Sequence, residues 1–401
     1  MFRHLPPVHS PISAEAIGVA FLALLSPRRA AQSREQVTQF ISDRFDARDV
    51  LLTDSGTSAL RLAIAGAARS KPGSCTALPA YCCYDVATAA DGAEVPVVLY
   101  DLDPATLGPR TESLERALGR PVSSVIVAHL YGHPVDVPTC QRLADSAGAI
   151  LIEDAAQGIG GRLLGRELGT FGSLSVLSLG RGKGWTGGSG GALLAHDERG
   201  EAIVAWARGR LGEGGAGAGD VARLAAQALL GHPRLYGLPA SLPFLRLGET
   251  IYHAPSAPRG PTAASGAAAS VAYRLLGEEI AVRRSNGERL LAAARAGGRV
   301  RPIATPAGGE PGFLRLPVIR GGDNPAARRS GARLGVAPGY PKALCDLPGF
   351  GERVVNRGGD FAGARDLAAR LATLPTHSRL SEGDVQQLEG WLTMPSGSQA
   401  G

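Results

Sequence analysis

Short apolar runs alternate with longer segments of helical periodicity through the first half of the chain. Residues 50–52, 149–153 and 174–179 are such runs, and each has the length and composition of a buried strand. Segments with helical periodicity separate these runs as far as about residue 194. The alternation predicts a mainly parallel sheet covered by helices on both faces.

The second half of the chain has a different pattern. Residues 201–247 have helical periodicity, and Val221, Leu224, Ala225 and Ala228 fall on one face that we expect to pack against the protein. We expect a long alanine-rich helix from residue 263, a strand at 313–318, and helices at 366–374 and 382–391. These patterns predict an extended arm (1–12), a large domain (13–250) with a helical insertion at about 201–247, a small domain (251–394) and a disordered tail (395–401).

One carboxylate and one lysine follow the ends of two predicted strands. Asp154 directly follows the run 149–153, and Lys183 stands in glycine-rich sequence after the run 174–179. A carboxylate at the carboxyl end of a strand points into the crevice where open α/β sheets bind ligands. Pyridoxal phosphate (PLP) needs such a pair, because a lysine amine condenses with its aldehyde while an acid keeps its pyridine nitrogen protonated. Without further evidence, the simpler interpretation is that Asp154 caps a helix and that Lys183 is a solvated loop residue.

The residues Ser55, Gly56, Thr57 and Ser58 stand where a helix begins after the strand 50–52. Backbone N–H groups and hydroxyls at a helix N-terminus can hold a phosphate against the positive end of the helix dipole. An ordinary N-cap explains the same residues equally well.

Blocks of sequence over roughly eight tenths of the chain resemble those of the DegT/DnrJ/EryC1/StrS family of PLP-dependent sugar aminotransferases. They occur in the order of that family: SGTSAL at 55–60, PAYCC at 79–83, PVVLYDLDPAT at 96–106, HLYGHPVD at 129–136, EDAAQ at 153–157, GTFG at 169–172, the block around Ser178, Lys183 with GGAL at 190–193, and LPTH at 374–377.

The resemblance implies a fold-type I α/β transferase with a mainly parallel seven-stranded sheet between helices and a smaller α+β C-terminal domain. It implies that Lys183 and Asp154 are catalytic and that the cofactor is PLP. It also implies Ser178 as a further phosphate ligand and Gln157 as the residue beside the phenolic oxygen of PLP. Active sites in the family lie at a subunit boundary, so it implies a homodimer.

Two segments depart from the family pattern. Many members place an aromatic side chain against the cofactor ring, whereas this chain has Cys83 there, with Tyr81 and Tyr84 nearby. Which of the three packs on the cofactor ring is not decided by the sequence. An asparagine-tyrosine-arginine stretch that helps the neighbouring subunit reach the site is replaced by GETIYH at 248–253, so contacts across subunits cannot be transferred.

Composition narrows the class of protein. A chain of 401 residues with 44% apolar composition can bury a large core. The net charge is +6, but the basic residues form no cluster and are not interleaved with aromatic residues as in nucleic-acid-binding proteins. This distribution favours an enzyme with a phosphate-bearing substrate over a protein that binds nucleic acid. Five cysteines without metal-ligand spacing fit the reduced thiols of a cytoplasmic protein, and we expect no metal site. No apolar run has the length of a membrane span, and we expect no cleaved signal.

Three functions remain open. The first is transfer of an amino group from an amino acid donor such as glutamate to a keto sugar, nucleotide-linked, for surface polysaccharide or a glycosylated metabolite. The second is another PLP reaction such as dehydration, which Lys183 disfavours because dehydrating relatives tend to have histidine there. The third is a non-catalytic relative with a binding role, against which the retention of Asp154, Gln157, Ser178 and Lys183 argues.

Overall fold

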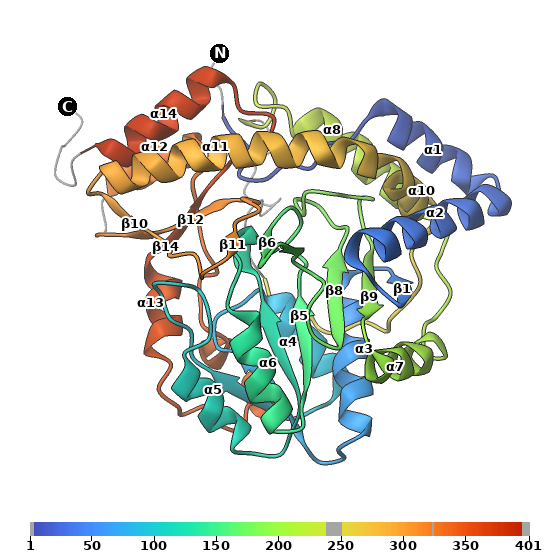
Figure 1. Ribbon diagram of the computed structural model, residues 1–401. Coiled ribbons are helices and arrows are strands. Elements are labelled where there is room, and N and C mark those ends of the chain that lie inside the picture. The colour runs from blue at the N-terminus through green and yellow to red at the C-terminus, as the bar shows by residue number, and fades with distance from the viewer. Residues whose placement is uncertain (1–3, 238–250, 323–324, 395–401) are drawn as a thin grey trace.

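The computed structural model describes residues 4–237, 251–322 and 325–394. Its first part is an α/β unit around a seven-stranded sheet (Figure 1). The strands follow the order β1 (Asp49–Thr53), β9 (Gly191–Ala195), β8 (Leu174–Ser178), β5 (Ile150–Asp154), β4 (Val122–Ala128), β2 (Cys75–Pro79) and β3 (Val97–Tyr100). Only β9 runs antiparallel to its neighbours, so the prediction of a mainly parallel seven-stranded sheet is confirmed.

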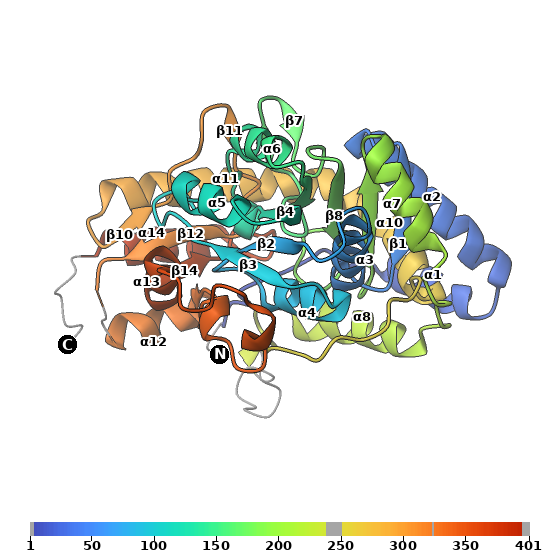
Figure 2. The same cartoon turned by 90° about the horizontal axis from the view of Figure 1, so that it is seen from below.

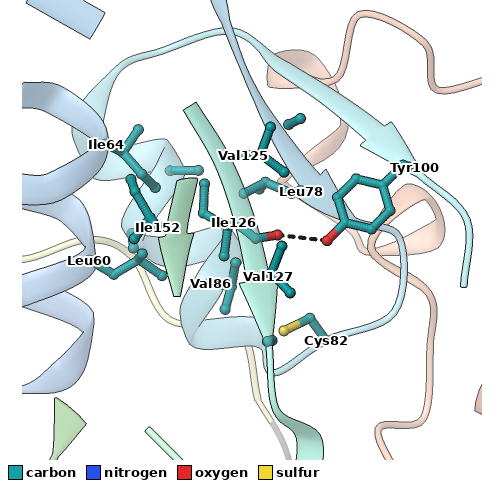
Figure 3. Packing of buried hydrophobic residues seen from close by; sticks show 14 of the residues in the cluster. Leu60, Ile64, Leu78, Cys82, Val86, Tyr100, Val125, Ile126, Val127 and Ile152 are labelled. Atoms are coloured by element: carbon teal, nitrogen blue, oxygen red, sulfur yellow. Dashed lines mark hydrogen bonds between the residues drawn. The ribbon is translucent and has the colours of Figure 1, made fainter. Parts of the chain in front are cut away.

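Helices cover this sheet on both faces, as the alternation of the sequence predicts. Figure 2 shows α5 and α6 on one face of strands β2 to β4 and α4 on the other. The helices of this part are α1 (Ala14–Leu24), α2 (Pro27–Phe45), α3 (Gly56–Arg69), α4 (Tyr84–Ala93), α5 (Thr111–Leu118), α6 (Val137–Ser146), α7 (Glu198–Arg208) and α8 (Ala218–Leu230). The core between them is mainly apolar (Figure 3), and within it the Tyr100 hydroxyl donates to the Ile126 carbonyl at 2.6 Å.

The C-terminal part forms a four-stranded antiparallel sheet in the order β10, β12, β14, β13. A three-stranded sheet of β11, β6 and β7 lies between the two parts of the chain (Figure 1). The bounds are β6 (Arg162–Leu163), β7 (Arg166–Glu167), β10 (Val300–Pro302), β11 (Gly309–Glu310), β12 (Leu316–Arg320), β13 (Ala337–Pro338) and β14 (Leu371–Leu374), with helices α10 (Ala263–Ala272), α11 (Leu276–Ala296), α12 (Pro325–Arg333), α13 (Ala362–Arg370) and α14 (Glu382–Thr393).

Three expectations for the second half of the chain need correction. The helix from residue 263 is interrupted by a 3₁₀ turn at Tyr273–Leu275. Phe313 has a left-handed φ of 47°, so the expected strand begins only at Leu316. Residues 371–374, the last part of the helix predicted at 366–374, instead form β14. They do so because this run is fully buried between β12 and β13.

The arm and the insertion are described in part. Residues 4–12 form neither helix nor strand, and this segment is held where Leu5 N–H donates to the Arg333 carbonyl at 3.0 Å. In α8, Leu224 is buried against α1 and α10 as predicted, whereas Ala225 is exposed. The predicted tail 395–401 and residues 238–247 of the insertion lie outside the described residues. No helix among the described residues is long and apolar enough to cross a membrane.

Candidate active site

The carboxyl ends of β4, β5 and β8 meet at one edge of the sheet. Ala128, Asp154 and Val176 are neighbours in register across these three strands, and all three line a cavity. The lining of that cavity is Gly56, Thr57, Leu60, Cys82, Cys83, Asp85, Val86, Ala128, His129, Leu130, Asp154, Ala156, Gln157, Val176, Ser178 and Lys183. Of the site residues singled out from sequence, Ser55, Ser58, Tyr81 and Tyr84 lie outside the lining, and the others belong to it.

One wall of the cavity is the N-terminus of α3. Ser55 is the N-cap, and its Oγ accepts from Ser58 N–H at 3.1 Å, so Ser55 satisfies the helix end rather than facing the cavity. A Cβ added to Gly56 would lie 3.0 Å from the Cβ of Ser178. Gly56 therefore lets the end of β8 approach the start of the helix. The free N–H groups there, with the hydroxyls of Thr57 and Ser178, form a cradle suited to a phosphate.

The adjacent acids Glu153 and Asp154 have different surroundings. Glu153 is fully buried and accepts from the N–H groups of Gly169 and Phe171, both at 2.7 Å, so it is fixed in the structure. Asp154 lines the cavity and accepts from Ala156 N–H at 3.1 Å. Burial raises the pKa of Asp154, while this hydrogen bond and the charge of Lys183 oppose the rise. Such a carboxyl gains from a cationic group placed against it.

The lysine stands in a loop with two left-handed glycines. Gly182 has φ 76° and Gly184 has φ 87°, and side chains there would collide with Val8 and Ile159, respectively. The loop is therefore pressed between the arm and the body of the protein. Lys183 lines the same cavity as Asp154.

Gln157 is held at both ends of its amide. Its Oε1 accepts from Tyr131 N–H at 2.9 Å, and its Nε2 donates to the hydroxyl of Tyr340 at 2.8 Å. Gln157 is thus not a polar residue on a helix surface, and residues 156–160 form a turn rather than a helix. The second N–H of its amide is left to face the cavity.

Cys83 is the one of the three candidates for the cofactor face that lines the cavity. Its Sγ donates to the Asp85 carboxylate at 3.4 Å, and burial raises its pKa to about 12, so it is a neutral thiol. Tyr81 is buried behind the cavity, where its hydroxyl accepts from Tyr340 N–H, and Tyr84 donates to the Lys342 carbonyl. Cys82 and Cys83 lie after the end of β2, in the connection to α4.

The sequence analysis did not identify His129 as a site residue. His129 lines the cavity directly after β4. Its Nδ1 accepts from Val135 N–H at 3.3 Å, so Nε2 carries the proton that is donated to Glu153 at 2.8 Å. His129 could have been found by the same pattern that identified Asp154, which is a polar residue at the carboxyl end of a parallel strand.

The donor set of the cavity suits PLP and not a metal ion. A phosphate cradle, a carboxylate, a fixed amide and an amine converge there, as PLP requires. Within residues 4–237, 251–322 and 325–394, no group of three or more histidine, cysteine, aspartate or glutamate side chains is arranged to hold a metal.

Comparison with known sequences identifies similar proteins. Residues 32–210 match the model of the DegT/DnrJ/EryC1/StrS aminotransferase family. An L-glutamine:2-deoxy-scyllo-inosose aminotransferase from Streptomyces kanamyceticus is 31% identical over 176 residues, which are 44% of this chain and 41% of that protein. A dTDP-3-amino-3,4,6-trideoxy-alpha-D-glucose transaminase from Streptomyces venezuelae is 36% identical over 148 residues, which are 36% of this chain and 38% of that protein. The chain therefore spans less than half the length of these curated relatives.

Comparison with solved structures extends the likeness to the whole fold. The sugar aminotransferase CalS13 from Micromonospora echinospora has a TM-score of 0.73 and 20% identity, and the match covers 97% of this chain and 99% of that chain. At this identity the match shows a shared architecture. It covers the C-terminal part as well, beyond the residues that the family model matches.

Proposed function

We propose that this chain, whose residues 32–210 match the model of the DegT/DnrJ/EryC1/StrS aminotransferase family, is a PLP-dependent aminotransferase of that family. In this proposal it takes an amino group from an amino acid, glutamate or glutamine, and transfers it to a keto sugar. The observation that carries the proposal is the convergence of Asp154, Gln157, Ser178 and Lys183 with the N-terminus of α3 in one cavity.

Each residue has a task that its surroundings support. PLP, when bound, supplies an aldehyde and an electron sink for the amino group transfer. Asp154 holds a proton at the pyridine nitrogen, since its buried carboxyl is best stabilised as an anion by a cation against it. Lys183 Nζ would hold the cofactor aldehyde and would serve as the general base and then the general acid of the reaction.

The remaining groups orient the cofactor and enclose it. Thr57, Ser178 and the N–H groups at the start of α3 bind the phosphate. The free N–H of Gln157 donates to the phenolic oxygen, while Tyr131 and Tyr340 fix the direction of the amide. Cys83 closes the wall as a neutral thiol. A keto sugar linked to a nucleotide, and a homodimer, are part of the proposal and rest on the family resemblance.

The assignment of Lys183 has a direct chemical test. The chain has three lysines, Lys71, Lys183 and Lys342, so the other two serve as internal controls. Borohydride reduction of the PLP-loaded protein should attach the cofactor to the peptide that contains Lys183, as measured by peptide mass spectrometry. Attachment to Lys71 or Lys342, or to no lysine, would contradict the proposal. In a Lys183→Ala variant the labelled peptide should disappear.

A further inference from the structure

The cavity contains a second carboxylate, Asp85, which has no task in the function proposed above. Asp85 stands in the first turn of α4, is exposed, and lines the cavity together with Asp154 and Lys183. It forms no ion pair with a described residue, and the hydrogen bond of its carboxylate is with Cys83. Its role is therefore to be sought in its effect on that thiol.

The hydrogen bond between Cys83 and Asp85 sets the direction of the thiol. Cys83 is the N-cap residue of α4, and its side chain makes no capping hydrogen bond. Instead, its Sγ donates to Asp85 Oδ2 at 3.4 Å. A thiol has one hydrogen, so this bond leaves the lone pairs of the sulfur for the other groups in the cavity. Both side chains line the cavity and form one piece of its wall.

The position of Cys83 would otherwise favour a thiolate. Cysteines at helix N-termini or beside a lysine lose their proton more easily, because both environments are positive. Cys83 stands at the start of α4 and shares the cavity with Lys183, whose charge lowers the pKa of the thiol. Burial and then the charge of Asp85 oppose this effect and raise that pKa to about 12, and Asp154 acts in the same direction more weakly. Asp85 is thus the charged residue that contributes most to keeping Cys83 protonated.

A protonated thiol matters in a cavity that receives an aldehyde. A thiolate at Cys83 could add to the aldehyde carbon of PLP: a C–S bond would form, and the carbonyl electron pair would take a proton to become a hydroxyl. This addition would compete with the amine of Lys183 for the same carbon.

We propose that Asp85 is a positioning residue, which holds Cys83 as a neutral thiol against the cofactor so that Lys183 is the residue that reacts with the aldehyde. This inference rests on the proposed function, because it takes the ligand of the cavity to be PLP. Asp85 lies outside the sequence blocks that resemble the family, so the resemblance gives it no role.

The test measures alkylation of the cysteines by iodoacetamide in the full chain without PLP, at mildly alkaline pH, with each thiol followed by peptide mass spectrometry. Asp85→Asn removes the charge and keeps the backbone, so Cys83 should react at least about tenfold faster, the effect of one pKa unit on the thiolate fraction. Asp85→Glu restores a carboxylate and should return the rate toward that of the wild type. Glu112→Gln, which neutralises an exposed acid in the first turn of α5, should leave the rate unchanged. Equal rates at Cys83 in the wild type and Asp85→Asn would overturn the proposal.

Cys82 separates this role from a general loosening of the fold. Its side chain is packed in the core (Figure 3), although it precedes Cys83 directly in sequence. The Cys82 thiol should therefore stay unreactive in Asp85→Asn. If Cys82 and Cys83 became reactive together, Asp85 would only stabilise the start of α4, and the proposal would be overturned.

A second arm repeats the alkylation after PLP is added. Bound PLP should slow the reaction of Cys83 in the wild type and in Asp85→Asn, and should not affect Cys75, a half-buried thiol that does not line the cavity. A visible PLP band without protection of Cys83 would overturn the contact between Cys83 and the cofactor. The absence of any visible band would instead mark failure of the proposed function, and the rates without PLP would still decide whether Asp85 controls Cys83.

Discussion

The amide of Gln157 is held by hydrogen bonds at both ends, and the residues that hold it come from distant parts of the chain. Tyr131 follows β4, whereas Tyr340 follows β13 in the C-terminal part. The rings of Tyr131 and Tyr340 are also stacked, with centroids 5.8 Å apart. Tyr340 is therefore a positioning residue, which acts on the cofactor through Gln157.

Tyr340→Phe removes the hydroxyl that accepts from Gln157 and leaves the ring in place. We expect the unfolding free energy to fall by about 1 kcal/mol and the affinity for PLP to drop, because the amide is no longer fixed. The visible spectrum of bound PLP should also change its pH dependence, which a purely structural loss would not cause. Tyr273→Phe is the matched control, since the Tyr273 ring stacks on Phe40 and its hydroxyl has no partner among the described residues. Equal pH profiles for the wild type and Tyr340→Phe would refute the positioning role.

At the level of elements, the start of α3 has two separate tasks. Ser55 caps the helix by accepting from Ser58 N–H, and the next two residues face the cavity. The helix end is presented to the cavity because Gly56 and Gly191 allow α3 to pack closely on β8 and β9; a Cβ on Gly191 would lie 2.4 Å from Gly56 N. The cap thus supports a binding surface to which its own side chain does not belong.

Ser55→Ala should cost about 1 kcal/mol of unfolding free energy, the usual value of an N-cap. It should also weaken PLP binding, because the first N–H groups of α3 lose their alignment. Ser26→Ala is the matched control, since Ser26 caps α2 in the same way but lies away from the cavity. Chemical unfolding and PLP titration of both variants decide the matter. If Ser26→Ala weakened PLP binding as much as Ser55→Ala, the loss of binding would come from lower overall stability, and the role of the α3 N-terminus would be contradicted.

On the scale of the whole molecule, a buried polar cluster fastens the arm to the C-terminal part. His377 Nε2 donates to the Pro6 carbonyl at 2.9 Å, and Arg283 donates to the His9 carbonyl at 2.6 Å. Arg283 is paired in turn with Glu279 at 2.7 Å, and both side chains are buried. The rings of His9 and His377 meet edge to face, with centroids 5.6 Å apart. The cluster keeps Val8 against the lysine loop.

This cluster should make the protein sensitive to acid. Burial, followed by neighbouring cations, lowers the pKa of His9 to about 2, and burial lowers the pKa of His377 to about 4. The unfolded chain takes up these protons near pH 6.5, whereas the folded chain does not. Stability is therefore present above about pH 6.5 and is lost as the pH falls toward 4, by up to about 1.4 kcal/mol per pH unit for each histidine. Urea unfolding across this range should show the loss, and His377→Asn should reduce its slope; an unchanged slope would contradict the assignment.

Much of the site was predictable because it follows the ends of strands. Asp154 and Ser178 are terminal residues of β5 and β8, and a parallel sheet brings such ends together. Tyr340 was not predictable, since its contact with Gln157 spans 183 residues and leaves no local pattern. Residues 371–374 were predicted as helix because α13 directly precedes them, and only pairing with β12 and β13 makes them a strand.

The central claim is that this cavity binds PLP and carries out amino group transfer. The most direct measurement is the visible absorption spectrum of the purified chain with PLP, recorded before and after L-glutamate is added, and repeated with L-glutamine. We predict a visible band from bound PLP that one of these donors converts to the spectrum of pyridoxamine phosphate. A band that neither donor changes would contradict aminotransfer from these amino acids. The absence of any band would contradict the cofactor site and favour a relative that only binds.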